Sequence, residues 1–345
     1  MPNTLRRLVI LLAFMVSAIP GASDGPKNAK AGIAEPGHGA KPALWRDPTD
    51  IASRNLLYGS GGEGRQPHGP FTFIEEDMEG TNPKFDVHDQ DGAKWKVKLG
   101  AEARPEVAAS RLLWAAGFFT NEYYFIEELH VQGLPPHLHR GQNLVASDGT
   151  LHNVRLKRSA KGEKKVGMWQ WASNPFVGTR EFNGLRVLMA LINNWDLKDS
   201  NNAVYDEKHN EGAADREQIY LVSDLGASFG TTGLALPLDS SKGNLDAYKH
   251  SKFISNITPD YVDFGAPSRP SLIETFNLPA FVRRVDLRWI GRHVARADAK
   301  WMGEVLSRLS TEQIRDAFRA AGYSPQEAIE FATVVQARIS ELNML

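Results

Sequence analysis

The sequence predicts an α+β protein with two lobes, a small sheet-rich lobe followed by a mainly helical one. Strand-like alternation of apolar and polar residues fills residues 71–99. Helical spacing of apolar residues fills residues 180–194 and much of the chain after Leu278. The length of 345 residues is enough for two lobes. We expect the first lobe over residues 51–133 and the second over residues 134–345.

Composition and charge exclude several classes of function. A hydrophobic content of 42% and an aromatic content of 9% suit an ordinary globular core. The net charge of −1 gives no overall basic field, so we expect no nucleic-acid partner. The chain contains no Cys, which excludes disulfides, thiolate metal sites, a cysteine nucleophile and a lipoprotein anchor.

The first residues have the order of a secretory signal peptide. Arg6 and Arg7 precede an apolar run at residues 8–19, and small residues follow at Gly21-Ala22-Ser23. The run is short for a membrane span. We therefore expect residues 1–23 to be a signal peptide, and an uncleaved membrane anchor is the alternative.

This pattern leads to an expectation about location. Residues 24–50 are rich in Gly, Ala, Lys and Pro, which predicts a flexible linker. With the signal peptide removed, we expect a periplasmic or secreted protein without a stable membrane anchor.

One strand of the first lobe carries a candidate functional lysine. Residues 94–99 alternate lysine with apolar residues, so ammonium groups gather on one face. A solvated strand face accounts for two of these lysines, and we expect Lys98 to face the site. Pro105 starts a predicted helix, and Glu106 in its first turn is placed to pair with Lys98. The plainer alternative is that Glu106 only favours the helix N-terminus.

One helix of the second lobe ends in a polar turn. Asp196 and Asn201 lie in this turn, and Asp224 ends a later apolar strand. We expect the three side chains to converge on one point. Phosphoryl transfer needs such a point, because a carboxylate must orient the attacking hydroxyl while an amide and a second carboxylate hold Mg²⁺.

The chain after Leu278 is predicted to be helical. Ser324, Pro325 and Glu327 form a capping signal for the last helix. The predicted helices are residues 285–295, 300–309, 311–321 and 324–342.

These motifs resemble those of the protein-kinase superfamily. Asp196-Leu197-Lys198-Asp199-Ser200-Asn201 is similar to the catalytic loop, and Asp224-Leu225-Gly226 is similar to the metal-binding tripeptide that follows it. Gly80-Thr81-Asn82-Pro83-Lys84 resembles the phosphate-side turn of HipA-type bacterial kinases, and Asn194 also matches that type. The resemblance covers roughly residues 71–342 in the order of elements.

The resemblance implies a two-lobed protein-kinase-like fold that binds ATP with Mg²⁺ or Mn²⁺ between its lobes. In the first lobe, it implies that Lys98 contacts the ATP phosphates and that Glu106 holds this lysine. Gly80 and Lys84 would line the phosphate-side turn.

In the second lobe, the resemblance implies roles for four residues. Asp196 would position the acceptor hydroxyl, and Lys198 would neutralise charge on the transferred group. Asn201 and Asp224 would bind the metal ion.

One departure from the family pattern leaves a second function open. The residues before Asp196 are Asn194-Trp195 rather than His-Arg. The sequence therefore predicts an exported phosphotransferase that uses a nucleotide and a hydroxyl of a protein, sugar or lipid, with a catalytically inactive pseudokinase-type binding module as the alternative. A metal hydrolase that uses His137 and His139 is a third class.

Overall fold

The structure is a computed structural model that describes residues 32–33, 40–80, 82–159, 164–206, 216–230, 241–265 and 287–345. The expected signal peptide, residues 1–23, lies outside the described residues. Thr81 of the predicted phosphate-side turn also lies outside them.

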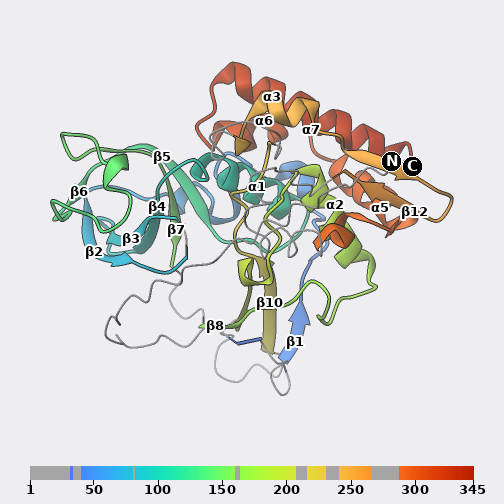
Figure 1. Cartoon of the computed structure of the whole chain (residues 1–345), viewed down its shortest axis with the longest axis horizontal. Coiled ribbons are helices and arrows are strands. Elements are labelled where there is room, and N and C mark those ends of the chain that lie inside the picture. The colour runs from blue at the N-terminus through green and yellow to red at the C-terminus, as the bar shows by residue number, and fades with distance from the viewer. Residues whose placement is uncertain are drawn as a thin grey trace, which may run out of the picture. The chain divides into compact units, whose positions relative to one another are not determined.

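Six strands form a curled sheet in the first part of the chain, in the order β5-β7-β4-β3-β2-β6. All neighbouring pairs are antiparallel except β2 and β6. Only His130 separates β5 from β6 in the sequence although they are the two ends of this order, so the sheet curls on itself (Figure 1). The strands are β2 (Phe71–Asp77), β3 (Lys84–His88), β4 (Lys94–Lys98), β5 (Tyr123–Leu129), β6 (Val131–Gln132) and β7 (Leu151–Arg158).

The alternation in β4 separates two environments. Trp95 and Val97 are buried in a core inside the curled sheet. On the other face, the side chains of Lys94 and Lys96 are 39% and 31% exposed and both pair with Asp86. The side chain of Lys98 is only 3% exposed. The end of the strand is therefore the one place where a lysine of β4 is enclosed by protein.

One expected lobe boundary separates paired strands, and the segment expected to be a linker contains a strand. β7 lies beyond residue 133 but pairs with β4 and β5, so the first sheet reaches Arg158. The segment expected to be a linker, residues 24–50, includes strand β1 (Ala40–Ala43), which pairs in parallel with β10. β1 belongs to a four-stranded sheet with β8 (Lys164–Gly167), β9 (Asn202–Asp206) and β10 (Arg216–Val222).

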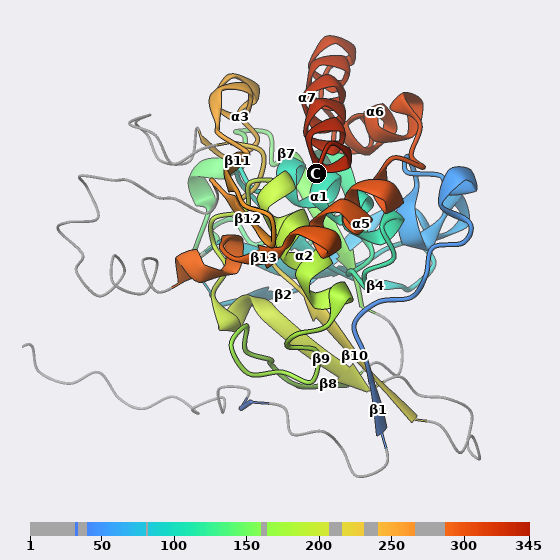
Figure 2. The same ribbon diagram turned by 90° about the vertical axis from the view of Figure 1, so that its right-hand side faces the viewer.

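Helices and two smaller sheets make up the second lobe (Figure 2). The helices are α2 (Arg180–Leu191), α3 (Leu245–His250), α5 (Arg296–Leu306), α6 (Thr311–Arg319) and α7 (Pro325–Asn343). A short sheet joins β11 (Ile254–Ile257), β12 (Tyr261–Phe264) and β13 (Val294–Ala295). The helix predicted at residues 285–295 is wrong in its described part, which forms a 3₁₀ turn at Leu287–Gly291 and then β13.

Local sequence signals explain where the helices begin. The Thr179 hydroxyl accepts a hydrogen bond from the Phe182 N–H at the start of α2. Ser324 and Glu327 form the predicted capping box at the start of α7. These caps satisfy N–H groups that have no partner inside a helix.

Two cores support the two lobes. One core lies within the curled sheet, and the larger one lies among the helices and includes the apolar residues of α1 (Ala103–Ala115). The predicted α+β architecture, a sheet-rich lobe followed by a mainly helical lobe, is confirmed. In the described part of the chain, no helix has the length and apolar character that a membrane span requires.

An aromatic cluster fixes the segment that follows Asp224. The Phe229 ring lies 5.0 Å from that of Phe318, 5.4 Å from that of Tyr248 and 6.0 Å from that of Phe331. These partners come from α3, α6 and α7, so the C-terminal helices hold the chain just beyond the predicted metal-binding tripeptide.

We expect Phe331→Ala to lower the free energy of unfolding by about 3–5 kcal/mol, the usual cost of removing a buried aromatic side chain. Ile329→Ala on the same helix is the matched control, because Ile329 is 44% exposed. Denaturant titration measures both variants. An equal loss in free energy of unfolding in the two variants would contradict a stabilising role of this aromatic cluster.

Candidate active site

Lys98 and Glu106 meet where β4 passes into α1. The strand ends at Lys98, and Glu106 lies in the first turn of the helix. The Lys98 ammonium Nζ lies 3.1 Å from Glu106 Oε2, and both side chains are almost fully buried. Two further carboxylates contact the same ammonium, from Glu102 at 2.5 Å and from Asp224 at 3.2 Å. The lysine of the first lobe therefore touches an acid of the second.

Arg155 on β7 contacts Glu106 and helps to hold this group of charged side chains. Its Nε donates a hydrogen bond of 3.0 Å to Glu106 Oε2, and its guanidinium lies over the Tyr123 ring at 4.6 Å. The Tyr123 hydroxyl in turn donates to the carbonyl oxygen of Ser223 at 2.6 Å. The acid on α1 is thus connected through the first sheet to the residue that precedes Asp224.

Backbone hydrogen bonds bring the two polar motifs of the second lobe together. The N–H groups of Ser223 and Asp224 both donate to the carbonyl oxygen of Asn201, at 2.7 and 3.3 Å. The N–H of Gly226 donates to Asp224 Oδ1 at 3.2 Å, which orients this carboxylate. Trp195 N–H donates to the carbonyl oxygen of Ala227 at 3.2 Å. The predicted convergence of the Asp196 turn and the Asp224 tripeptide is therefore present in the backbone.

The polar turn itself is held by its own side chains. Asn201 Nδ2 donates to the carbonyl oxygen of Asp196 at 2.6 Å and to its Oδ2 at 3.3 Å. The Asp196 N–H donates to Asn194 Oδ1 at 3.0 Å. The Lys198 ammonium lies 2.8 Å from Asp196 Oδ1. These contacts fix the direction of the Asp196 carboxylate, whose side chain is 26% exposed.

Burial and neighbouring charges shift the pKa values of Lys98 and Asp224 in opposite directions. Burial alone would lower the pKa of the Lys98 ammonium, but the carboxylates around it outweigh burial and raise that pKa above its ordinary value of 10.5. Burial opposes ionisation of Asp224, yet Lys98 and the Gly226 N–H outweigh it, so the pKa of this carboxyl lies below its ordinary 3.8. Both groups are charged at neutral pH.

Two oxygens at this point suit a divalent metal ion. Among the described residues, neither Oδ1 of Asn201 nor Oδ2 of Asp224 has a hydrogen-bond partner. An amide oxygen and a carboxylate oxygen are hard ligands of the kind that Mg²⁺ and Mn²⁺ prefer. The residues present therefore fit the predicted metal.

The phosphate-side turn lies next to Lys98, because Lys84 is the residue opposite Lys98 in the pairing of β3 with β4. Lys84 Nζ is 3.5 Å from Asp77, and burial together with the neighbouring cations lowers the pKa of Lys84. Gly80 has a positive φ of 66°, which favours glycine, and its carbonyl oxygen accepts a hydrogen bond from Arg140. Neither predicted turn residue contacts the Lys98 ammonium directly.

The residue of this turn that does reach the site is Asn82, which the sequence analysis did not single out. Its Nδ2 donates to Glu102 Oε2 at 2.6 Å. Glu102 also accepts from Lys242 Nζ at 2.8 Å. Sequence reasoning missed Glu102 and Lys242 as well, although Glu102 lies midway between Lys98 and Glu106 at helical spacing.

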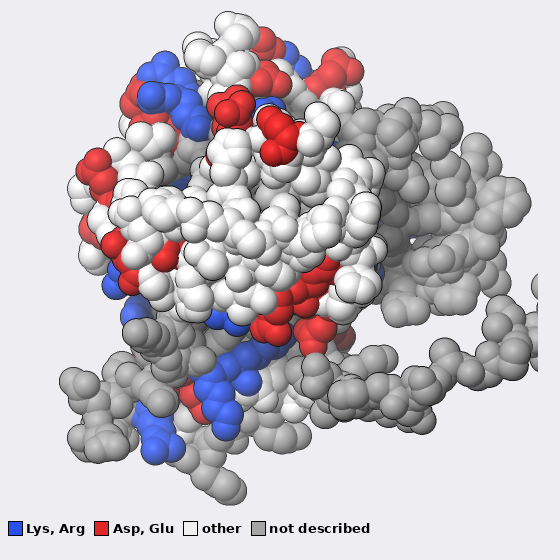
Figure 3. Space-filling view, turned by 90° about the vertical axis from the view of Figure 1, so that its left-hand side faces the viewer, with Lys and Arg blue, Asp and Glu red and all other residues white. Residues whose placement is uncertain are grey.

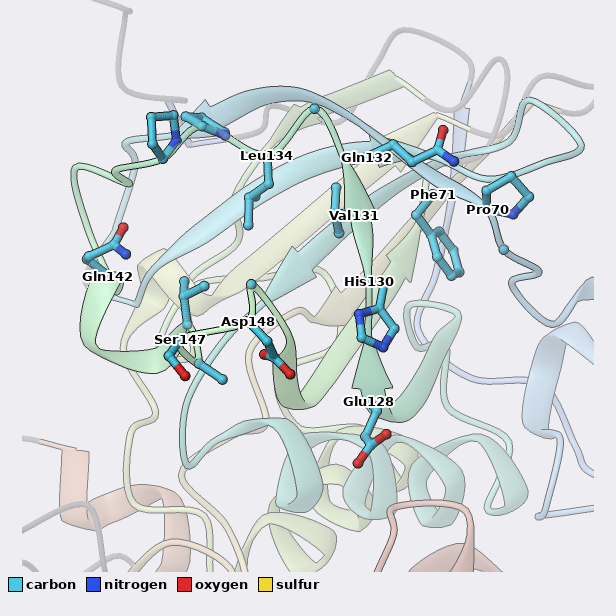
Figure 4. Close-up of a pocket in the computed structure, with 17 residues that line it drawn as sticks. Pro70, Phe71, Glu128, His130, Val131, Gln132, Leu134, Gln142, Ser147 and Asp148 are labelled. Atoms are coloured by element: carbon cyan, nitrogen blue, oxygen red, sulfur yellow. The ribbon is translucent and has the colours of Figure 1, made fainter.

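The remaining candidates lie apart from this group. His139 contacts Glu76 through its backbone N–H and its ring, and the described residues contain no group of three or more His, Cys, Asp or Glu side chains that could hold a metal. A hollow of about 760 Å³ lies in the first lobe, between apolar Val131 and Leu134 and polar His130 (Figure 4). None of the predicted site residues lines it. The surrounding face of this lobe is largely uncharged (Figure 3).

The charge of Asp224 should make stability depend on pH. Folding lowers the pKa of the Asp224 carboxyl. Its contribution to stability is therefore fully present above the pKa of the unfolded state and is lost as pH falls through the pKa of the folded state. We expect wild type to exceed Asp224→Asn by about 1 kcal/mol in free energy of unfolding near neutral pH, a modest value because the side chain is 37% exposed.

Denaturant titration at several pH values measures this difference. It should stay constant from about pH 5 to 9, since the raised pKa of Lys98 keeps the ammonium charged there, and shrink below about pH 4. Asp246→Asn is the control, because this side chain is 89% exposed. A difference that grows as the solution is acidified would contradict the Lys98–Asp224 pairing.

No family model matches the chain, and no curated protein matches its sequence. Among solved structures, the chain is similar to the Helicobacter pylori proinflammatory kinase CtkA, with 10% identity, a TM-score of 0.42, and coverage of 79% of this chain and 95% of that one.

Two other similar structures are also kinases. The Golgi casein kinase has 10% identity, a TM-score of 0.34, and coverage of 87% of this chain and 77% of that one. The Rio2 kinase–ADP/Mg²⁺–phosphoaspartate complex from Chaetomium thermophilum has 13% identity, a TM-score of 0.29, and coverage of 78% and 72%. None of the three is described as HipA-type, so that finer resemblance stays a prediction.

Likeness at these levels assigns no residue and no substrate to this chain. Its fold is read from its own elements: a curled sheet that ends in Lys98, a helix that carries Glu106, and a helical lobe that presents Asp196, Asn201 and Asp224. These elements follow one another in the order that the sequence predicts.

Proposed function

We propose that this chain is a kinase-like phosphotransferase that moves a phosphoryl group from a nucleotide, with ATP as the expected donor, to a hydroxyl group. The observation that carries this proposal is the contact of Lys98 with both Glu106 and Asp224. A buried lysine at the end of a strand that pairs with an acid of the first helix and with a candidate metal-binding acid is suited to hold phosphates beside a metal ion.

Each residue of the site has a part in the proposed reaction. Lys98 contacts the phosphates of the donor, and Glu106 keeps the ammonium in place. Asn201 and Asp224 would hold Mg²⁺ or Mn²⁺, whose charge would offset that of the phosphates. Gly80 and Lys84 would border the phosphates from the turn, and Asn82 of the same turn is connected to Lys98 through Glu102.

Asp196 and Lys198 act on the acceptor side. Asp196 accepts the hydrogen bond of the acceptor hydroxyl and takes its proton as the new oxygen–phosphorus bond forms. The bond between the γ-phosphorus and its bridging oxygen breaks, and the nucleoside diphosphate leaves. Lys198, which lies 2.8 Å from Asp196, neutralises charge on the transferred group.

The acceptor class is a hydroxyl of a protein, a sugar or a lipid. A catalytically inactive pseudokinase-type binding module is the second candidate. The observation that favours it is the contact of the Lys98 ammonium with three carboxylates, with which a nucleotide phosphate would have to compete. The two candidates differ in whether phosphoryl transfer occurs.

We expect Asp196→Asn to lower phosphoryl transfer by a factor of about 100 or more, because the acceptor hydroxyl loses its base. Nucleotide affinity should stay within about threefold, since Asp196 is placed on the acceptor side. Asp224→Ala should instead abolish the effect of Mg²⁺ on nucleotide binding. Transfer of ³²P from γ-labelled ATP measures the first effect, and calorimetry measures the second.

Asp148→Asn, on the exposed loop of the first lobe, is the control for both assays. Nucleotide binding without transfer in wild type would support the binding module. An absence of nucleotide binding in wild type with either metal ion would contradict both candidates.

We further propose that the protein acts outside the cytoplasm, on the basis of residues 1–23. Mass spectrometry of the protein recovered from a secreting host should give a mature N-terminus close to residue 24. Replacing Leu11 and Leu12 by Arg should keep the protein in the cytoplasm with its N-terminus intact. An uncleaved N-terminus in the exported wild type would contradict the signal peptide and favour an anchor.

A further inference from the structure

Glu102 is an internal carboxylate in contact with donors from three parts of the chain. Its Oε2 lies 2.5 Å from Lys98 Nζ and accepts from Asn82 Nδ2 at 2.6 Å. Its Oε1 accepts from Lys242 Nζ at 2.8 Å. The residue packs so closely on Gly226 that a Cβ built there would lie 2.6 Å from the Cβ of Glu102. The carboxylate is only 11% exposed.

These contacts are not explained by capping of the adjacent helix. Glu102 is the N-cap residue of α1, where a carboxylate usually accepts a hydrogen bond from the first turn. Its side chain makes no such bond. Instead it turns toward Lys98, Asn82 and Lys242, which include two ammonium groups. The Glu102 carboxylate therefore contacts the residues of the site and does not cap the helix.

The donors around Glu102 are the kind that bind phosphate oxygens. Two ammonium groups and an amide N–H₂ form charge-assisted hydrogen bonds with phosphate as readily as with carboxylate. A phosphate that entered beside Glu102 would add a second anion at short range, which is unfavourable in a poorly hydrated site. A phosphate that replaced the carboxylate would keep the same donors and would again place an anion beside the two ammonium groups.

Lys242 is well placed for such a contact because the backbone that directly follows it is held by hydrogen bonds. The N–H of Gly243 donates to the carbonyl oxygen of Ser228 at 2.9 Å. Asn244 then caps α3 through a bond from the Ala247 N–H. Lys242 thus reaches Glu102 from a segment whose backbone is hydrogen-bonded to Ser228. Ser228 lies four residues after Asp224.

We propose that Lys242 and Asn82 join Lys98 in a binding subsite for a phosphate group of the nucleotide, and that Glu102 occupies this subsite until the phosphate displaces it. This inference rests on the proposed nucleotide function and adds two binding residues and an internal competitor to it. Displacement of Glu102 also frees the Lys98 ammonium, which is otherwise shared among three carboxylates.

Substitution of Glu102 shows whether its carboxylate competes with the phosphate or helps to bind the nucleotide. Glu102→Gln keeps the size of the side chain but removes its charge, so phosphate should compete more easily. We expect ATP with Mg²⁺ to bind about tenfold more tightly to this variant than to wild type, in calorimetric titrations. Adenosine, which has no phosphates, should bind equally to both. Glu330→Gln is the matched control, because Glu330 pairs with Lys249 on the surface.

Lys242→Met made in the Glu102→Gln background tests the new ligand without leaving Glu102 unpaired. We expect it to weaken ATP binding about tenfold relative to Glu102→Gln alone and to leave adenosine binding unchanged. Lys249→Met in the same background is the control. Thermal unfolding of each variant shows whether the fold is retained, and Glu102→Asp gives a second, shorter carboxylate should Glu102→Gln fail to fold.

Glu102→Asp should bind ATP at least as tightly as wild type, because the shorter side chain reaches the donors less well. Weaker ATP binding in Glu102→Gln or Glu102→Asp, at retained fold, would overturn the proposal, since Glu102 would then assist the nucleotide. Loss of adenosine binding in parallel with ATP binding in the lysine variant would also overturn it.

Inorganic tripolyphosphate separates failure of this subsite from failure of the kinase function. If no nucleotide binds to any variant but tripolyphosphate binds more tightly to Glu102→Gln than to wild type, the subsite stands and the kinase function fails. If ATP binds with Mg²⁺ while Glu102→Gln and Lys242→Met leave its affinity unchanged, the kinase function stands and the subsite fails.

Discussion

The site depends on one buried ammonium group. Lys98 is enclosed at the end of β4, and it keeps its charge because carboxylates surround it. A charged group in such a place is unfavourable unless it is paired. The fold therefore has to bring Glu106 and Asp224 to the lysine, and this requirement ties the curled sheet, the first helix and the helical lobe together.

The supporting contacts follow from that requirement. Arg155 braces Glu106 from the sheet, and Tyr123 connects the sheet to the residue before Asp224. Phe229 then anchors the chain beyond Asp224 among the C-terminal helices. The site is thus supported by packed elements on both sides, which is what precise placement of reacting groups requires.

Much of this arrangement could be predicted from local sequence. The alternation of residues 94–99 placed three lysines on one face, of which the structure encloses Lys98. The short spacing to Glu106 allowed their contact because a strand end and a helix start are close in space. The distance of five residues between Asp196 and Asn201 placed both in one turn, where the structure joins them by hydrogen bonds. Capping residues located the last helix.

The parts that could not be predicted depend on contacts between distant segments. Lys242 meets Glu102 across 140 residues of sequence, and no periodicity encodes that meeting. β7 joins the first sheet beyond residue 133 because it pairs with strands that precede it by a long loop. The apolar residues near 290 have helical spacing but form a turn and a strand, because their partner is β12.

We propose that Lys98 and Asp224 face a single nucleotide site. An acyl-phosphate derivative of ATP carries a group that acylates a lysine beside the bound phosphates, and peptide mass spectrometry identifies the modified residue. We predict that Lys98 is labelled, that excess ATP with Mg²⁺ prevents the labelling, and that Asp224→Ala removes this protection. Labelling of exposed lysines such as Lys249 with Lys98 unmodified, and with no protection by ATP, would contradict the account.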